Sequence, residues 1–394
     1  MSAAALNDVH SEGPLGVPRL LAGVRADGGA VSLHSHLRRY GALPFDGRRP
    51  ADDLHSLVAH AGLTGRGGAA FPVATKLEAV RGGRGRPVVV ANGAEGEPAS
   101  GKDKVLLAYT PHLVLDGAVL AARAVGAREA IVTTASRTAT AAVVAAIGER
   151  RDAGVSLRVV TVPDRFIAGE ETALVQFLNG GPCLPTLTPP RPFERGVGGA
   201  PTLVQNVETL AHVALIARFG PDWFRAIGTP DEPGSALVTL SGAVRRPGVY
   251  EFALGSPFSE LLQEAGGTTA AVQAYLVGGY FGTWIDANDA STTRLSDAAL
   301  EPYGASLGAR AVVALPADTC GVAETARVAA YLAAESAGQC GPCVFGLAAV
   351  ADDLNRLRNR LGHVDESLLR RRLGQIPGRG ACRHPDGAVR LVAS

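Results

Sequence analysis

The sequence lacks a charge imbalance and a long apolar run, and its first residues do not have the pattern of a signal peptide. Its 38 lysines and arginines nearly balance 37 aspartates and glutamates, for a formal net charge of +1. This excludes the strongly basic surface that would favour nucleic acid or an acidic membrane as a partner. No stretch reaches the roughly 18 apolar residues of a membrane span, and the first residues lack the pattern of a signal peptide. We therefore expect a cytoplasmic protein that does not insert into a membrane.

Cysteine is scarce. The five cysteines form an odd, sparse set, unlike the disulfide framework of a small secreted protein. Cys340 and Cys343 are spaced as a Cys-x-x-Cys pair, which indicates metal, cluster or redox chemistry. Cys183 and Cys320 stand apart from it and are expected to be buried thiols.

The chain is long for one hydrophobic core and suggests two or three domains. Short apolar strands are predicted at 87–91, 129–133 and 157–162. A helix over 111–125 separates the first two, and an Ala-rich helix that follows the second strand and ends at 151 separates the last two. This alternation is typical of a largely parallel sheet covered by helices. A stretch rich in Pro, Gly and Thr over 180–201 predicts a long ordered loop, and such loops are usually functional.

The pattern changes after residue 235. Residues 236–285 are rich in β-forming residues, with a short helix at 258–262. They resemble the SLBB domain, a small β-grasp module, on the strength of Ser241-Gly-Ala-Val, Arg246-Pro-Gly-Val-Tyr250 and Ala265-Gly-Gly. The remainder has helical apolar spacing at 328–332, 347–357 and 368–373. Because two cysteines lie between the first two helices and Cys382 lies in a Gly- and Pro-rich tail, a small cluster- or metal-binding bundle is predicted.

Two Gly-rich loops are candidates for binding an anionic ligand. The first, residues 62–72, precedes a predicted helix, and glycines beside a helix N-terminus let backbone N–H groups approach a phosphate. The second, residues 92–98, follows a buried strand, where open α/β sheets bind ligands. Either loop could be a simple turn, and Glu95 and Glu97 of the second loop could be only part of a solvated turn. The only three lysines of the chain, Lys76, Lys102 and Lys104, lie beside these loops and favour an anion or nucleotide site.

Five motifs in a fixed order make the assignment specific. They are Gly65-Arg-Gly-Gly-x-x-Phe-Pro with Lys76, Asn92-x-x-Glu-Gly-Glu-Pro, Gly169-Glu-Glu-Thr-Ala173, Pro201-Thr-x-x-x-Asn-Val-Glu-Thr209 and Gly338-Gln-Cys-Gly-Pro-Cys343. Together with the SLBB pattern, they resemble the flavin-binding component of respiratory complex I and its relatives in NAD-linked hydrogenases and formate dehydrogenases. The resemblance covers roughly residues 50–385.

The resemblance implies a fold and a function. After a polar lead-in over 1–50, it implies a Rossmann-like α/β domain that binds FMN and NADH over 51–235. An SLBB β-grasp domain over 236–318 and a helical domain with a 4Fe–4S cluster over 319–394 follow. An NADH dehydrogenase-like electron-transfer flavoprotein is implied, in which FMN takes electrons from NADH and passes them singly to the cluster. The implied partner is a ferredoxin-like or other iron–sulfur subunit, and the chain itself is expected to be cytoplasmic or peripheral to a membrane complex.

The resemblance also implies roles for individual residues. The implied cofactor-binding residues are Gly65, Arg66, Gly67, Gly68, Phe71, Lys76, Asn92, Gly96, Phe166, Gly169 and Asn206. The implied carboxylates of the flavin and nicotinamide face are Glu95, Glu97, Glu170 and Glu171. The implied cluster ligands are Cys340, Cys343 and Cys382.

The chain departs from the family pattern at several of these sites. Ala94 stands where an Asp is usual and Phe166 where a Tyr is usual, while Ala79 and Gly198 replace two aromatics that enclose NADH. Loss of a stacking ring predicts weaker binding of the dinucleotide.

The cluster pattern is incomplete because Ala337 occupies the first cysteine position. Three possibilities stay open: a cluster on three thiolates with another ligand, a Cys₃His site completed by His384 that would suit zinc as well, or an empty site. A non-catalytic scaffold of the same fold is the alternative to the electron-transfer role.

Overall fold

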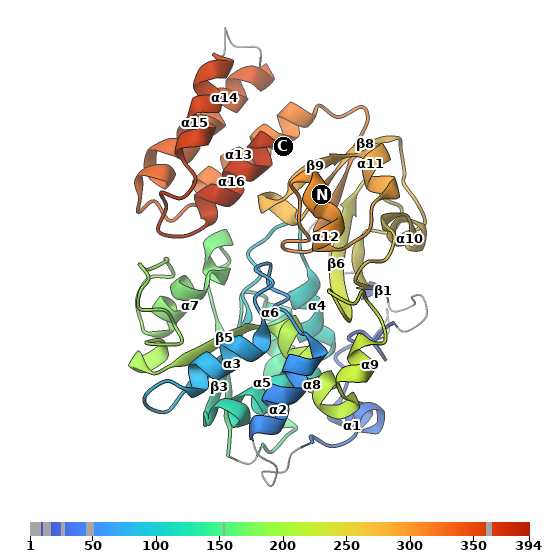
Figure 1. Ribbon diagram of the computed structural model, residues 1–394, viewed down its shortest axis with the longest axis vertical. Helices are drawn as coiled ribbons and strands as arrows, with labels where there is room; N and C mark the ends of the chain where they lie inside the picture. Colours follow the sequence, from blue (N-terminus) through green and yellow to red (C-terminus); the bar gives the residue numbers. More distant parts are fainter. Residues whose placement is uncertain (1–8, 11–16, 25–27, 45–50, 153, 360–364) are drawn as a thin grey trace.

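The architecture is that of a computed structural model, which describes residues 9–10, 17–24, 28–44, 51–152, 154–359 and 365–394. Side chains are described for these residues except 9, 10 and 51–53. Much of the predicted lead-in over 1–50 therefore lies outside the described residues. Figure 1 shows three parts, with helices α13–α16 at the top, strands β6, β8 and β9 to their right, and an α/β part below.

The α/β part is built on a parallel sheet of four strands. These are β2 (Val88–Gly93), β3 (Glu129–Thr134), β4 (Ser156–Thr161) and β5 (Thr202–Asn206), in the order β4-β3-β2-β5. The first three confirm the strands predicted from their apolar runs. Sequence reasoning missed β5, which has only five residues and directly follows the Pro-rich loop.

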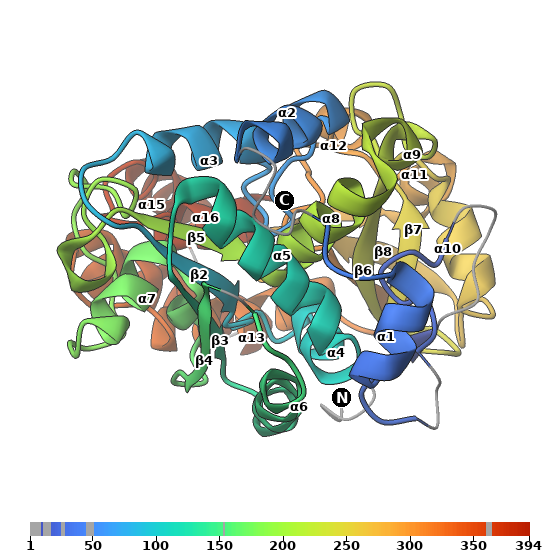
Figure 2. The same ribbon diagram turned by 90° about the horizontal axis from the view of Figure 1, so that it is seen from below.

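Helices cover the two faces of this sheet unequally. One face packs on α5 (Pro111–Val125) and α8 (Val207–Phe219), surrounded by α2 (Ala51–Ala61), α3 (Val73–Arg81), α4 (Lys102–Tyr109) and α6 (Arg137–Gly148) (Figure 2). Gly117 lets α5 and α8 touch, since a Cβ there would lie 1.9 Å from the Leu210 carbonyl oxygen. The other face packs on α7 (Glu171–Leu178) and on part of the loop that follows it.

The described part of the predicted lead-in is packed into the core. Leu20 and Leu21 are fully buried, and helix α1 (Leu33–Tyr40) lies against α5. A buried charge cluster holds α1 there: Asp116 of α5 binds His36 Nε2 at 2.7 Å and Arg150 at 2.6 Å. Strand β1 (Val9–His10) pairs in parallel with β7 (Gly248–Ala253).

The middle part is a second, mixed sheet. Its strands are β6 (Ser235–Gly242), β7 (Gly248–Ala253), β8 (Val272–Val277), β9 (Thr283–Asp286) and β10 (Ala311–Pro316), in the order β1-β7-β6-β10-β8-β9. Strand β10 lies beyond the predicted β-rich stretch, yet it joins the halves of the sheet by pairing in parallel with β6 and antiparallel with β8. Short helices α10 (Phe258–Glu264), α11 (Ala287–Thr292) and α12 (Asp297–Leu300) accompany it, whereas α9 (Pro221–Arg225) packs on α2 and α8 of the α/β part.

The last part is a bundle of four helices. They are α13 (Gly321–Ala334), α14 (Ala348–Asn359), α15 (Glu366–Gln375) and α16 (His384–Ala393), with a π-helical turn over Pro342–Leu347. The first three match the predicted helical stretches, whereas α16 lies where the sequence predicts only a tail. The bundle shares an apolar core with the second sheet, in which Val328 and Leu391 meet Leu276 and Val313.

No single helix in the described ranges is long and apolar enough to cross a membrane. Helices α4 and α5 pass that test only as a pair, with a bend of 96° between them. The domain boundaries at 51, 236 and 319 stay predictions.

Candidate functional site

A cavity of about 660 Å³ opens at the carboxyl ends of β2 and β5. The chain runs from β2 outward through β3 to β4 and then returns to the opposite side of β2 as β5. Such a reversal of strand order leaves a crevice in which open α/β sheets bind ligands. The register places Asn92 directly opposite Asn206 at this crevice. The volume lies within the range of about 300–1,000 Å³ that is usual for ligand sites.

All three parts of the fold line the cavity. The site residues predicted from the sequence that line it are Gly67, Gly68, Asn92, Glu95, Gly96, Glu97, Phe166, Gly169, Glu170 and Asn206. The second sheet contributes Gly278, Phe281 and residues 306–309 except Leu307, and the bundle contributes His384 and Gly387. Of the predicted cofactor and catalytic residues, Gly65, Arg66, Phe71, Lys76 and Glu171 do not line it.

The first Gly-rich loop offers free backbone donors. The N–H groups of Gly67 and Gly68 make no hydrogen bond to any residue that the structure describes, although both residues line the cavity. Amides of this kind are what an anionic group such as a phosphate requires. Gly67 also packs so closely on Asn206 that a Cβ would lie 3.2 Å from its Cβ.

Arg66 holds this loop in place through hydrogen bonds on the side away from the cavity. Its guanidinium donates to the Pro233 carbonyl at 3.2 Å and to the Thr64 hydroxyl at 3.1 Å. Its backbone N–H donates to Thr209 Oγ1 at 2.8 Å. Burial, reinforced by the neighbouring Arg310, lowers the pKa of Arg66 to about 9. The charge of Arg66 is therefore directed away from the cavity.

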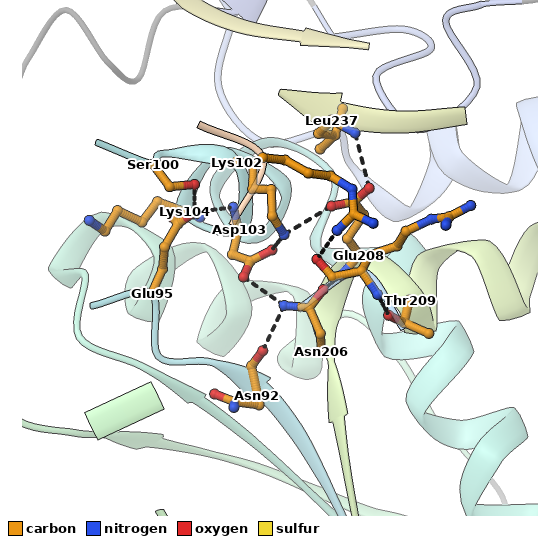
Figure 3. A network of polar contacts seen from close by, with 12 residues as sticks. Asn92, Glu95, Ser100, Lys102, Asp103, Lys104, Asn206, Glu208, Thr209 and Leu237 are labelled. Atoms are coloured by element: carbon orange, nitrogen blue, oxygen red, sulfur yellow. Dashed lines mark hydrogen bonds and ion pairs between the residues drawn. The ribbon is translucent and has the colours of Figure 1, made fainter. Parts of the chain in front are cut away.

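Buried charges form the floor of the cavity (Figure 3). Lys102 Nζ lies 2.6 Å from Asp103 Oδ1 and 2.9 Å from Glu208 Oε2. Asn206 Nδ2 donates to Asp103 Oδ2 at 2.7 Å, and Glu208 accepts the Leu237 N–H. Burial alone would lower the pKa of Lys102, but the two carboxylates outweigh it and raise that pKa. Two carboxylates thus neutralise Lys102, so it stabilises the floor instead of offering a free cation.

Two of the predicted catalytic carboxylates cap helices. Glu95 accepts the backbone N–H groups of Asp103 at 3.3 Å and Lys104 at 3.2 Å, at the start of α4. Glu170 accepts those of Thr172 and Ala173, both at 2.9 Å, at the start of α7. A carboxylate at a helix N-terminus pairs with free N–H groups and with the positive end of the helix dipole. Both therefore hold loops of the cavity wall in place.

Glu171 forms an ion pair with Lys76 at 3.0 Å, away from the cavity. Lys76 and Lys102 are thus both paired with carboxylates, which the sequence did not indicate. The groups available to bind an anion are therefore the backbone amides of Gly67 and Gly68, and not the side chains of these two lysines.

Glu97 joins the two sheets. Its Oε1 accepts the Ala99 N–H at 3.0 Å, and its Oε2 accepts the N–H of Tyr280, from the second sheet's part of the chain, at 2.8 Å. Burial raises the pKa of Glu97 to about 7 against the effect of these two N–H groups. Gly279 is needed at this contact, because a Cβ there would lie 2.7 Å from Glu97 Oε2.

Gly96 and Gly169 allow two loops to meet backbone to backbone. A Cβ on Gly96 would lie 2.4 Å from the Arg165 carbonyl oxygen, and one on Gly169 would lie 2.5 Å from that of Ala94. Asn92 adds a hydrogen bond from its Nδ2 to the Gly169 carbonyl at 2.9 Å. These predicted residues therefore position the loops around the cavity.

Three rings form an apolar wall, of which the sequence predicted only Phe166 as part of the site. Phe166, Phe281 and His384 lie edge to face, with centroids 4.7 to 5.4 Å apart. His384 Nε2 lies 2.7 Å from the Leu332 carbonyl oxygen and must carry the proton, since that oxygen only accepts. Its Nδ1 is buried and has no partner among the described residues. No pattern in the sequence indicates that His384 faces this cavity.

The three predicted cluster ligands lie close together in the bundle. Burial raises the pKa of the Cys343 thiol to about 11, reinforced by Cys340 and by Cys382. Burial also acts on Cys340, but N–H groups of Ala381 and Cys343 outweigh it and lower its pKa. The described residues contain no group of three His, Cys, Asp or Glu side chains placed for a single metal ion.

The remaining cysteines are not deeply buried. Cys320 is exposed at the N-terminus of α13, so the prediction of a buried thiol was wrong there. Cys183, in the Pro-rich loop, is half-buried.

Comparisons with known proteins cover most of the chain. Family models match as the Nuo51 FMN-binding domain at residues 58–215, the SLBB domain at 237–279 and the NADH-ubiquinone oxidoreductase-F iron–sulfur binding region at 323–394. The F subunit of NADH-quinone oxidoreductase of Mycobacterium tuberculosis is 35% identical over 92% of this chain and 86% of its own length. A second relative, the F 2 subunit of NADH-quinone oxidoreductase of Rhizobium meliloti, is 33% identical over 94% and 90%.

A solved structure has the same fold. One chain of an NAD⁺-reducing nickel–iron hydrogenase in the H₂-reduced state superimposes with a TM-score of 0.81 at 31% identity. The match covers 89% of this chain and 64% of that one. These matches confirm the predicted resemblance and fold class, and the chain belongs to the family of NADH-quinone oxidoreductase F subunits.

Proposed function

We propose that this chain is an electron-input subunit that oxidises NADH and passes the electrons through FMN to an iron–sulfur cluster. The single observation that carries the proposal is the cavity at the β2–β5 crevice, which touches helix α16 of the cysteine-bearing bundle. Family membership confirms the predicted class, an FMN- and iron–sulfur-dependent oxidoreductase, and does not favour the scaffold alternative.

The residues present fit FMN. The amides of Gly67 and Gly68, which no described residue engages, face a cavity of suitable volume and would hold the phosphate. Asn92 and Asn206 stand at the same edge, and the rings of Phe166 and Phe281 offer apolar surface for a flat ring system. Bound FMN supplies the conversion of a two-electron donor into one-electron steps.

The chain's own residues would orient the reactants and exclude water. The network of Lys102, Asp103 and Glu208 is almost wholly buried, so the floor of the cavity is rigid and closed to solvent. Glu97 locks the second sheet over the cavity through the Tyr280 N–H. Fixed groups of this kind hold a donor against an acceptor without reorganisation during the transfer.

The site proposed for NADH lacks two aromatic side chains. Ala79 and Gly198 bring no ring to the positions that the family resemblance associates with NADH, and a Cβ at Gly198 would meet nothing within 4 Å. Each missing aromatic contact is worth about 1 kcal/mol. We therefore expect NADH to bind, but more weakly than in a site with both rings.

The electron acceptor is proposed to be a ferredoxin-like or other iron–sulfur subunit. The bundle that carries the cysteines lies at one end of the molecule, where such a partner can approach (Figure 1). A cytoplasmic location, peripheral to a larger assembly, and the domain boundaries at 51, 236 and 319 are retained as proposals.

The test is anaerobic purification of the full chain with iron and flavin supplied, followed by flavin assay, an absorption spectrum and addition of NADH. Bound FMN that bleaches on NADH supports the proposal. FMN that ignores NADH but is reduced by dithionite would overturn NADH as the donor. A chain that binds no flavin would overturn the electron-transfer role itself.

A further inference from the structure

The bundle builds three ligand positions for an iron–sulfur cluster. Cys340 and Cys343 lie at the start of the π-helical turn Pro342–Leu347, and Cys382 lies just before α16, which packs on that turn. The family model for an iron–sulfur binding region covers all three cysteines.

Among the described residues, no fourth cysteine acts on the thiols of these three. A four-iron cluster is ordinarily held by four cysteines. Ala337 stands between the end of α13 and Gly338, whose φ of 63° turns the chain back toward Cys340. Cys320 lies at the opposite end of α13, about 20 Å away along 14 residues of helix. Cys183 lies in the loop after α7, in the α/β part of the chain.

Two neighbouring side chains of other types, those of His384 and Asp386, are held in place by hydrogen bonds. His384 donates to the Leu332 carbonyl, and its ring lies between Phe166 and Phe281 on the cavity side. Both carboxylate oxygens of Asp386 have partners, since Oδ1 accepts the Gly378 N–H and Oδ2 accepts from Arg383. His384 Nδ1 has no partner among the described residues, but the ring lines the cavity and forms no metal-type group with two other His, Cys, Asp or Glu side chains that the structure describes. The position of His384 therefore gives the Cys₃His alternative no support.

We propose that Cys340, Cys343 and Cys382 alone bind the cluster, so that one iron has no protein ligand and carries an exchangeable small ligand. This rests on the function proposed above, because it concerns the cluster of that same electron path. The site is open to solvent on that side: Gly338 and Gln339 are exposed, and Ala337 is half-exposed. Water or a small thiol can reach an iron there.

An iron without a protein ligand is the one most easily lost. Oxidation by ferricyanide removes one electron and one Fe²⁺ from a 4Fe–4S cluster in its 2+ state. A 3Fe–4S cluster in its 1+ state remains, ferricyanide is reduced to ferrocyanide, and all four sulfides stay. Each of the three remaining irons keeps its cysteine.

The test compares the wild-type chain with Ala337→Cys and with Ser336→Cys. All three are purified anaerobically with FMN, treated with ferricyanide, and assayed for iron per chain and for the electron paramagnetic resonance of an oxidised three-iron cluster. Wild type should lose about one iron in four and show that signal, whereas Ala337→Cys should keep its iron and show none. Ser336→Cys adds a thiol one residue away and should behave as wild type.

Other outcomes separate this inference from the proposed function. A wild-type cluster that keeps four irons under ferricyanide would overturn the inference, and loss of that resistance in His384→Ala would identify the unexpected ligand. FMN that bleaches on NADH in a chain with zinc or no metal would also overturn the inference alone. Failure to bind FMN, with iron and sulfide intact, would overturn only the proposed function.

Discussion

Lys102 allows a direct test of how the floor of the cavity is held. Lys102→Met keeps the length of the side chain and removes its charge. It would leave the buried carboxylates of Asp103 and Glu208 without their cationic partner. Their oxygens lie 2.6 and 2.9 Å from Lys102 Nζ, and their side chains are 7% and 0% exposed. Removing one partner from a buried ion pair costs about 3–5 kcal/mol, a large part of a total stability of about 5–15 kcal/mol. We expect a loss of that size in the free energy of unfolding.

The assay is equilibrium urea denaturation at a fixed excess of FMN, because bound ligand shifts the apparent stability. Lys104→Met is the matched control: Lys104 lies on the same helix, is half-exposed and makes no ion pair with the described residues, so we expect about 0.5 kcal/mol or less. Lys102→Met with Glu208→Gln removes one stranded charge and should recover more than about 1 kcal/mol. A loss in Lys102→Met no larger than that of the control would refute the reasoning.

Three further predictions concern the pH dependence and the cavity. Because the pKa of Glu97 is raised from 4.5 to about 7, its contribution to stability is full below pH 4.5 and is lost as the pH rises through 7. Wild type should lose up to about 3 kcal/mol over that range in urea melts, and Glu97→Gln should flatten the slope; an unchanged slope would contradict the assignment. Burial would raise the pKa of Asp116, but its cationic partners hold it below 3.8, so its contribution is present above pH 3.8 and lost as the pH falls. Asp116→Asn should cost about 3–5 kcal/mol at pH 7 and less in acid, which the same melts at pH 7 and pH 3 would check. Gly67→Val fills the space beside Asn206 and should weaken FMN binding at least about tenfold in a flavin-fluorescence titration. Gly148→Ala, where a Cβ meets nothing, is its control, and equal affinities would contradict the assigned phosphate loop.

Local signals in the sequence were sufficient for most of the elements. Helix Pro111–Val125 begins with a proline in its first turn and ends before Gly126 in a left-handed conformation, and its predicted limits agree with the structure. Strand β5 had no such signal, since pairing with β2 makes a strand of five residues that follow a Pro-rich loop. Helix α16 was likewise missed, because its glycine and proline resemble a tail until its apolar residues pack on α13 and the second sheet.

The sequence by itself determined the family, the order of the three parts, the two glycine loops and the deficit of one cysteine. These depend on residue types at fixed spacing, which need no tertiary contact to be recognised. Only the tertiary structure decided what each charged residue does: Arg66 turns away from the cavity, Lys102 is neutralised, and Glu97 binds an amide 183 residues further along the chain. The physical reason is that a buried charge is stable only beside a compensating group. The position of that group is set by how distant segments pack.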